Sequence, residues 1–164
     1  MEKIPAIAFS AWSGTGKTTL VEKLIYELKS RGLRIAAIKH DAHRFEIDKE
    51  GKDSWRFTHA GADMTIVSSP EKTAIIETRE RSLADNLSMI HDVDLILVEG
   101  WKNEQLPRIG ISRKATGKGL PAAPETYIAI VSDEEFENCP VPVFGLEQII
   151  AIADFIVEKT KVLD

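Results

Sequence analysis

Short apolar runs and helically spaced apolar residues alternate along the first part of this chain. Residues 4–10 form an apolar run that ends in small residues, and a glycine-rich segment follows at 11–19. Beyond it Leu20, Leu24 and Leu28 recur at helical spacing, with lysines and glutamates on the other side. Gly32 is suited to end this helix. The pattern therefore predicts a strand, a loop and an amphipathic helix, in that order.

A second apolar run, residues 33–38, follows the predicted helix. Two strands joined by a helix are expected to pair in parallel with each other as a right-handed βαβ unit. Neither run alternates with polar residues, which is typical of strands in a sheet that is covered on both faces.

The rest of the chain continues this mixture of strands and helices. Strands are expected at 64–68 and 73–78, as an antiparallel pair, and at 94–98, 108–112, 126–131 and 141–144. Helices are expected at 54–60, at 82–90 with Ser82 as N-cap and Asp85 three residues on, and at 146–159. Segments 39–53 and 114–125 are expected to be loops. The predicted fold class is α/β, with a mostly parallel central sheet and helices on both faces, in one domain spanning 1–164.

The composition narrows the setting of this domain. The 164 residues are 43% apolar and 29% charged, an ordinary mixture for a soluble domain. A single cysteine, Cys139, allows no internal disulfide, which favours a cytoplasmic location. The formal net charge of −5 argues against a broad electrostatic contact with nucleic acid. We find no secretory leader or membrane-spanning stretch, so a membrane is not an expected partner. Because of the net charge, nucleic acid is not an expected partner either.

The segment between the first strand and the first helix matches the phosphate-binding pattern G-x-x-x-x-G-K-[ST], except that Ala11 replaces the first glycine. An alanine is tolerated there if its φ stays negative. Two glycines let the backbone curl so that successive N–H groups point at an anion, and the lysine adds charge for the β- and γ-phosphates. The predicted nucleotide-binding residues of this loop are Ser13, Gly14, Thr15, Gly16, Lys17, Thr18 and Thr19. A three-layer P-loop NTPase is the expected fold.

The pair Gly14 and Gly16 is also half of a dinucleotide-binding fingerprint. Thr19, however, stands where that fingerprint has its third glycine, and the second strand ends in Lys39 and His40 rather than in a ribose-binding acid. We therefore reject the dinucleotide interpretation.

Carboxylates at two strand ends complete the predicted nucleotide site. A P-loop requires an acidic group at the end of an apolar strand, and Glu99 fits. We expect Thr18 and Glu99 to ligate Mg²⁺ and Lys17 and Glu99 to be the catalytic residues, whereas Asp94, at the other end of the same strand, is expected to be structural. Asp133 ends another strand, where it is placed either to accept hydrogen bonds from a guanine or to serve as a turn residue, because the guanine-reading N-K-x-D string is absent.

The polar loop after the second strand carries His40, Asp41 and His43, without a further ligand at a spacing familiar for zinc. Its position is instead typical of a segment that senses the γ-phosphate. No arginine is obviously placed to act on the phosphates, with Arg44 and Arg56 as the candidates, so only slow hydrolysis is expected.

These motifs together resemble the molybdopterin-guanine dinucleotide biosynthesis protein B family, over nearly the whole chain. Besides the P-loop, the resemblance rests on K-H-x-x-H at 39–43 with G-K-D-[ST] at 51–54, and on the strand end E-G-[FW]-K at 99–102. Ala60-Gly61-Ala62 and Val131-Ser132-Asp133 also match. The departures, Ala11 and Trp101, are not phosphate ligands.

The resemblance implies a dimeric GTP-binding adapter with weak intrinsic GTPase activity. Such a protein would use GTP and Mg²⁺ and would assist a molybdopterin guanylyltransferase that joins GMP to molybdopterin. It also implies that His40 and His43 belong to a nucleotide-facing or partner-facing loop. Two other interpretations stay open: a small-molecule kinase with residues 113–118 as its lid, and a structural protein with a vestigial nucleotide site.

Overall fold

The structure, a computed structural model, describes residues 3–40, 44–101 and 105–162. The chain divides into two compact units, Met1–His40 with Ile90–Asp164, and Asp41–Met89. The α/β class predicted from the sequence is confirmed. That both units belong to a single domain stays a prediction.

A six-stranded sheet in the order β2-β5-β1-β6-β7-β8 forms the centre of the first unit, and every pairing in it is parallel. Its strands are β1 (Ala6–Ala11), β2 (Ile35–Lys39), β5 (Leu95–Glu99), β6 (Arg108–Ile111), β7 (Ala129–Val131) and β8 (Val143–Phe144). The helices are α1 (Lys17–Ser30) and α4 (Ile149–Val162). Of two 3-10 turns, η1 (Lys114–Thr116) lies in the predicted loop 114–125, and η2 (Pro124–Thr126) extends one residue beyond it. Because the strands are parallel, their carboxyl ends share one edge.

The expectation that the first two strands pair with each other is wrong. β5 lies between β1 and β2, with Ile96 opposite Ala6 on one side and Ala36 on the other. All residues of β5 from Leu95 to Val98 are buried, whereas β2 has exposed positions. The most apolar strand loses the most contact with water in the interior of the sheet, so β2 is left at the edge.

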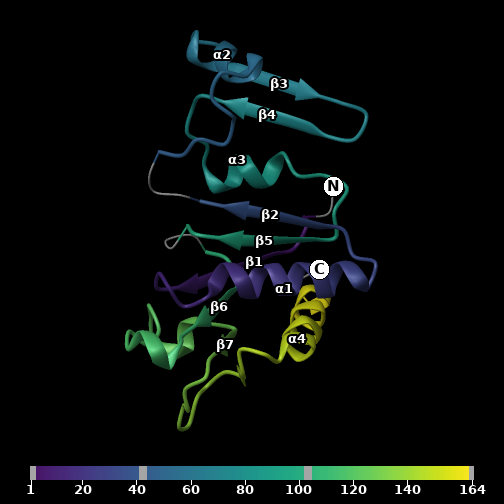
Figure 1. The fold of residues 1–164 in the computed structure, drawn as a ribbon. Helices are drawn as coiled ribbons and strands as arrows, with labels where there is room; N and C mark the ends of the chain where they lie inside the picture. Colours follow the sequence, from purple (N-terminus) through teal and green to yellow (C-terminus); the bar gives the residue numbers. More distant parts are fainter. Residues whose placement is uncertain (1–2, 41–43, 102–104, 163–164) are drawn as a thin grey trace. The chain divides into compact units, whose positions relative to one another are not determined.

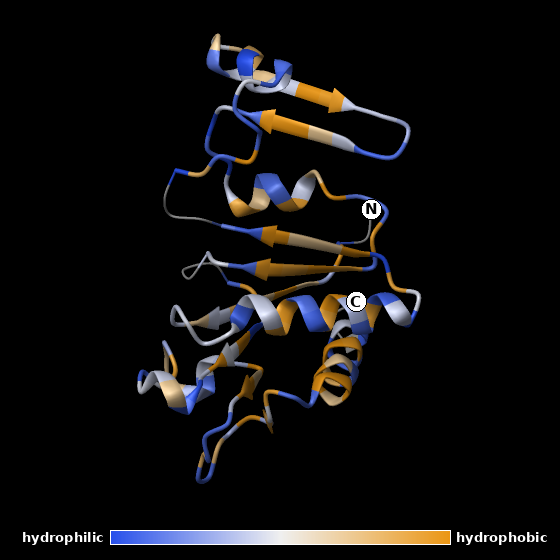
Figure 2. Cartoon of the chain, in the orientation of Figure 1, coloured by the Kyte–Doolittle hydropathy of each residue, from blue (hydrophilic) through white to orange (hydrophobic). Residues whose placement is uncertain are grey.

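One face of the sheet packs against α1 and α4, which lie side by side (Figure 1). Figure 2 shows apolar strands and apolar positions along α1. The predicted residues Leu20, Leu24 and Leu28 are buried. Gly32, with φ +85, follows the C-cap, and its N–H donates to the carbonyl of Lys29, so its predicted role as a helix end is confirmed.

The opposite face of the sheet is buried as well, which explains the continuous apolar runs. Ala8, Val98 and Ile130 point to that face and are at most 2% exposed. Gly110 is required there, because a Cβ at this position would lie 2.9 Å from the ring of Tyr127.

The second unit contains an antiparallel hairpin, as predicted, formed by β3 (Met64–Ser68) and β4 (Thr73–Glu77), with helices α2 (Asp53–His59) and α3 (Leu83–Ser88). The hydroxyls of Thr65 on the hairpin and Thr58 on α2 are 3.0 Å apart. At the start of α3, Ser82 and Asp85 form the predicted capping box. Within the described residues, no helix is both long enough and apolar enough to cross a membrane.

Candidate functional site

The predicted phosphate-binding loop joins β1 to α1 at the carboxyl edge of the sheet. Gly14 and Gly16 have φ values of +84° and +86°, a conformation that other residues rarely adopt. Between them Thr15 is buried, and its hydroxyl donates to the carbonyl of Trp12 at 3.0 Å, which closes the turn. Ala11 is a buried strand residue outside the positive-φ set, so the alanine is tolerated as expected.

The loop presents backbone donors to an anion. Gly16 is the N-cap of α1 and, as a glycine, has no side chain to cap the first N–H groups of that helix. The two left-handed glycines and the helix start give the curled backbone that binds phosphate in other proteins. This arrangement can hold the phosphates of a nucleotide.

Lys17 and Glu99, the two predicted catalytic residues, lie next to each other. Lys17 opens α1 and Glu99 ends β5, the neighbour of β1, with Glu99 in register with Phe9. The Nζ atom of Lys17 is 3.5 Å from Oε1 of Glu99, and the two side chains are 21% and 17% exposed. The strand order therefore places one cation and one carboxylate at the phosphate-binding loop.

Thr18 and Glu99 provide a hydroxyl and a carboxylate oxygen, the donor types that Mg²⁺ prefers. Among the described residues there is no group of three or more His, Cys, Asp or Glu suited to a metal ion. Mg²⁺ at nucleotide sites needs no such group, because phosphates and waters supply most of its ligands. The donor set fits Mg²⁺.

A tight contact between two strand ends fixes the position of Glu99. The N–H of His40, directly after β2, donates to the carbonyl of Glu99 at 2.8 Å, and the His40 and Trp101 rings lie 4.5 Å apart. Gly100 has φ +101°, and a Cβ there would lie 2.7 Å from the Cβ of His40. His43 and Asp41 of the predicted loop lie outside the described residues.

Asp133 follows β7 and is exposed to solvent. Its Oδ1 accepts a hydrogen bond of 2.7 Å from the backbone N–H of Lys114. Nearby, the buried hydroxyls of Ser112 and Ser132 are 2.8 Å apart. Asp133 thus ties the end of β7 to the loop after β6, and its reading of a guanine stays a prediction.

Arg113, which was expected only in the lid of the kinase alternative, lies at the phosphate-binding loop. Its guanidinium atoms are 3.8–4.0 Å from the position that a Cβ would take on Gly16. In the sequence, Arg113 could be seen to lie just beyond a predicted strand. Its approach to the P-loop depends on the pairing of β6 with β1, which brings that strand end to the loop. The earlier candidates Arg44 and Arg56 belong to the second unit.

Comparisons with known proteins identify the family of this chain. Residues 6–133 match the family model of molybdopterin guanine dinucleotide synthesis protein B. The chain is similar to proteins named molybdopterin-guanine dinucleotide biosynthesis adapter protein. The relative from Haemophilus influenzae is 40% identical over 94% of this chain and 88% of its own length, and the Escherichia coli relative is 40% identical over 94% and 93%.

Solved structures show the same fold. A crystal structure of Bacillus subtilis MobB superposes with a TM-score of 0.75 at 26% identity, covering 94% of this chain and 96% of the other. A crystal structure titled molybdopterin-guanine biosynthesis protein B gives a TM-score of 0.69 at 26% identity, covering 93% and 98%. A mostly parallel sheet surrounded by helices, as in these structures, confirms the predicted α/β P-loop NTPase fold. With the family model covering most of its length, the chain belongs to the molybdopterin guanine dinucleotide synthesis protein B family.

Proposed function

We propose that this chain is a GTP-binding adapter of molybdopterin-guanine dinucleotide biosynthesis. Membership of the family and the adapter name of its 40% identical relatives support the adapter role and not the small-molecule kinase. The nucleotide part of the proposal rests on one observation, the curled loop of Gly14 and Gly16 with Lys17 held against Glu99 beside it.

In this proposal the N–H groups of the loop donate to phosphate oxygens of GTP. Lys17, now 3.5 Å from the Glu99 carboxylate, would turn its ammonium group to the β- and γ-phosphates. Thr18 and Glu99 would hold Mg²⁺, which supplies positive charge against the phosphates. Ser13, Thr15 and Thr19 complete the loop.

Hydrolysis would be a slow side activity. Water attacks the γ-phosphorus in line, the bond from that phosphorus to the β–γ bridging oxygen breaks, and GDP and inorganic phosphate leave. Glu99 would hold Mg²⁺ near the γ-phosphate. Lys17 would stabilise the negative charge that develops on the departing oxygen.

As an adapter the chain would act in the cytoplasm on a molybdopterin guanylyltransferase, and on the molybdopterin that this enzyme carries. His40 and His43 would face the nucleotide or that partner, and Asp133 would contact the guanine. We also propose that the chain is a homodimer, because apolar side chains of the β3–β4 hairpin, among them Ile66 and Ile75, are 58% and 51% exposed.

Calorimetric titration of GTP and of ATP, each with and without Mg²⁺, tests the proposal. We expect GTP to bind more tightly than ATP, and Mg²⁺ to strengthen the binding of GTP. If neither nucleotide binds, the GTP-binding part of the proposal is refuted. If both bind equally well, the guanine preference is refuted, but nucleotide binding by the P-loop is retained.

A further inference from the structure

Apart from the chain neighbours of Gly16, the N-cap of α1, Arg113 is the side chain nearest to the Cβ position of that glycine. Three of its guanidinium atoms, Nη1, Cζ and Nη2, lie 3.8, 3.9 and 4.0 Å from the Cβ position of Gly16. The backbone N–H groups that follow Gly16 are the donors expected to bind the β-phosphate of a nucleotide. A planar guanidinium beside them has the geometry for hydrogen bonds to the same phosphate.

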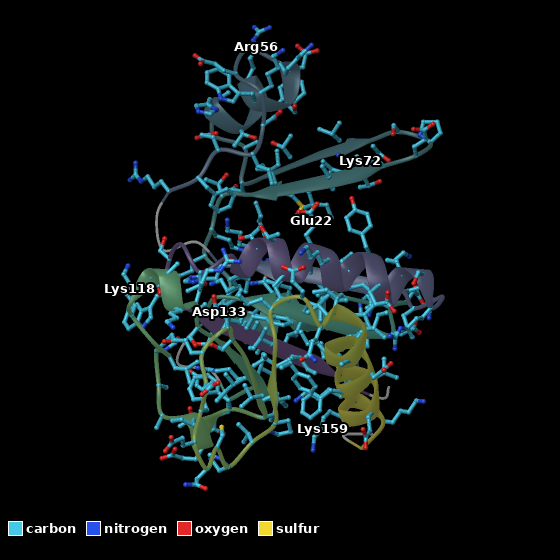
Figure 3. The ribbon with its side chains drawn as sticks, turned by 60° about the horizontal axis from the view of Figure 1, so that its bottom comes forward. Glu22, Arg56, Lys72, Lys118, Asp133 and Lys159 are labelled. Carbon is cyan, nitrogen blue, oxygen red and sulfur yellow. The ribbon has the colours of Figure 1, made fainter. Side chains whose placement is uncertain are left out.

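The loop that carries Arg113 is held by several hydrogen bonds. The backbone carbonyl of Arg113 accepts hydrogen bonds from the N–H of Thr116 at 2.9 Å and from the Thr116 hydroxyl at 2.8 Å. The next residue, Lys114, donates its N–H to Asp133 at 2.7 Å, and the preceding one, Ser112, is hydrogen-bonded to Ser132. In Figure 3 Asp133 lies on the sheet side of this loop and Lys118 at its outer edge. The contacts fix the backbone from which the guanidinium extends.

Arg113 is a cation beside the phosphate-binding loop that has no ion-pair partner among the described residues. Lys17 is paired with Glu99 at 3.5 Å on the β5 side of β1. Arg113 comes from the β6 side, is partly buried, and makes no ion pair within the part of the chain that the structure describes. The 2.8 Å hydrogen bond from Lys23 is the main cause that lowers the pKa of the Glu147 carboxyl, and the nearby charge of Arg113 adds to this lowering. A partly buried cation whose anionic neighbour is paired with another residue favours an anionic ligand.

We propose that Arg113 is a second phosphate-binding residue, acting from the same chain, whose guanidinium donates hydrogen bonds to the β-phosphate of the bound nucleotide. The phosphates then lie between two cations, Lys17 on one side of β1 and Arg113 on the other. Asp133 acts as a positioning residue for Arg113 through Lys114. The inference rests on the proposed nucleotide binding.

The test compares Arg113→Ala and Arg113→Lys with Lys118→Ala, which removes one positive charge from an exposed position in the same loop. Affinities for GDP and for inorganic pyrophosphate are measured by calorimetry and by competition. Arg113→Ala should lose about tenfold or more in affinity for both ligands, because a charged hydrogen bond is removed. Arg113→Lys should lose less, and Lys118→Ala should stay within about twofold of wild type.

Three results overturn the inference. One is an Arg113→Ala variant that binds GDP as wild type does. Another is a loss for GDP without a loss for pyrophosphate, which assigns Arg113 to the base or ribose. The third is an equal loss in Lys118→Ala, which reduces the effect to general charge. Thermal unfolding of each variant without ligand checks the fold, and if Arg113→Ala is unfolded, Arg113→Lys and an Arg113→Gln variant carry the comparison.

The same measurements separate this inference from the proposed function. If wild type binds neither GDP nor GTP, the proposed function fails. If wild type binds both and Arg113→Ala binds them equally well, only the assignment of Arg113 fails.

Discussion

At the scale of single residues, Lys17 is expected to serve the ligand rather than the fold. Its only described partner is Glu99 at 3.5 Å, and a partly exposed ion pair of this length adds little stability. Lys17→Ala should therefore lower GTP affinity by about tenfold or more while leaving the unliganded melting temperature nearly unchanged. Calorimetry and thermal unfolding measure the two quantities. Lys29→Ala, at an exposed lysine of the same helix, is the matched control, and equal GTP affinity in Lys17→Ala would contradict the assignment.

Glu99 is expected to matter more for turnover than for binding. Glu99→Gln keeps the size of the side chain and removes the charge that would face Mg²⁺. It should retain most of the GTP affinity and lose most of the single-turnover hydrolysis rate. Unaffected turnover would show that Glu99 is not the magnesium residue.

Gly100 sets the position of Glu99 and is expected to be intolerant of a side chain. With φ +101° and His40 atoms 2.7–3.3 Å from the Cβ position, Gly100→Ala should cost about 1–3 kcal/mol of unfolding free energy. Gly145→Ala is the control, because its Cβ would meet only ordinary contacts at 3.6 Å or more. Urea unfolding of both variants tests this, and equal stabilities would argue against the tight strand-end contact.

The residues that sequence alone could predict are those whose chemistry is local. The P-loop glycines and Lys17 follow one another along the chain, so their spacing carries their geometry. Arg113 is separated from Lys17 by most of the chain, and its approach to Gly16 depends on β6 pairing with β1. No local pattern contains that pairing.

At the scale of elements, the start of β5 is anchored by charge. Asp94 accepts a 2.6 Å hydrogen bond from the N–H of Arg34 and pairs with the guanidinium at 3.1 Å, and the side-chain hydrogen bond is the larger cause that lowers the pKa of Asp94 below its usual value. This confirms the structural role predicted for Asp94. It also explains how β2 and β5 are aligned, because Arg34 directly precedes β2.

A lowered pKa in the folded state gives this contact a defined pH dependence. The contact stabilises the fold above the unfolded-state pKa, about 3.9, and its contribution is lost as the pH falls through the lower folded-state pKa. Asp94→Asn should therefore lower the melting temperature near pH 7, and the difference from wild type should shrink below about pH 4. Thermal unfolding across this range, with Arg34→Gln as the partner variant, tests it. A difference independent of pH would assign the effect to something other than the carboxylate charge.

Element types were predictable because period and composition distinguish strands from helices. Strand order was not, since a helix between two strands fixes only that they run parallel. The insertion of β5 between β1 and β2 reflects the burial of Leu95 to Val98 on both faces, a property of the whole sheet.

At the scale of the whole molecule, the two units differ in how far they bury their apolar residues. The first has a continuous core between its sheet, α1 and α4. In the hairpin of the second, Met64, Ile66 and Ile75 are 48%, 58% and 51% exposed. Ile66 and Ile75 are directly opposite in the antiparallel pair, so they share one face. The sequence predicted the hairpin but not this exposure, because its β-branched residues fit a covered strand equally well.

A second copy of the chain is the partner that the homodimer proposal assigns to this face. In a twofold dimer the same patch contacts itself, so one charged substitution places two like charges in the interface. Ile66→Asp should therefore convert a dimer into a monomer in sedimentation analysis. Ile150→Asp, at an exposed isoleucine of α4, should leave the dimer intact. A dimer that survives Ile66→Asp would move the interface elsewhere, whereas a monomeric wild-type chain would refute the homodimer itself.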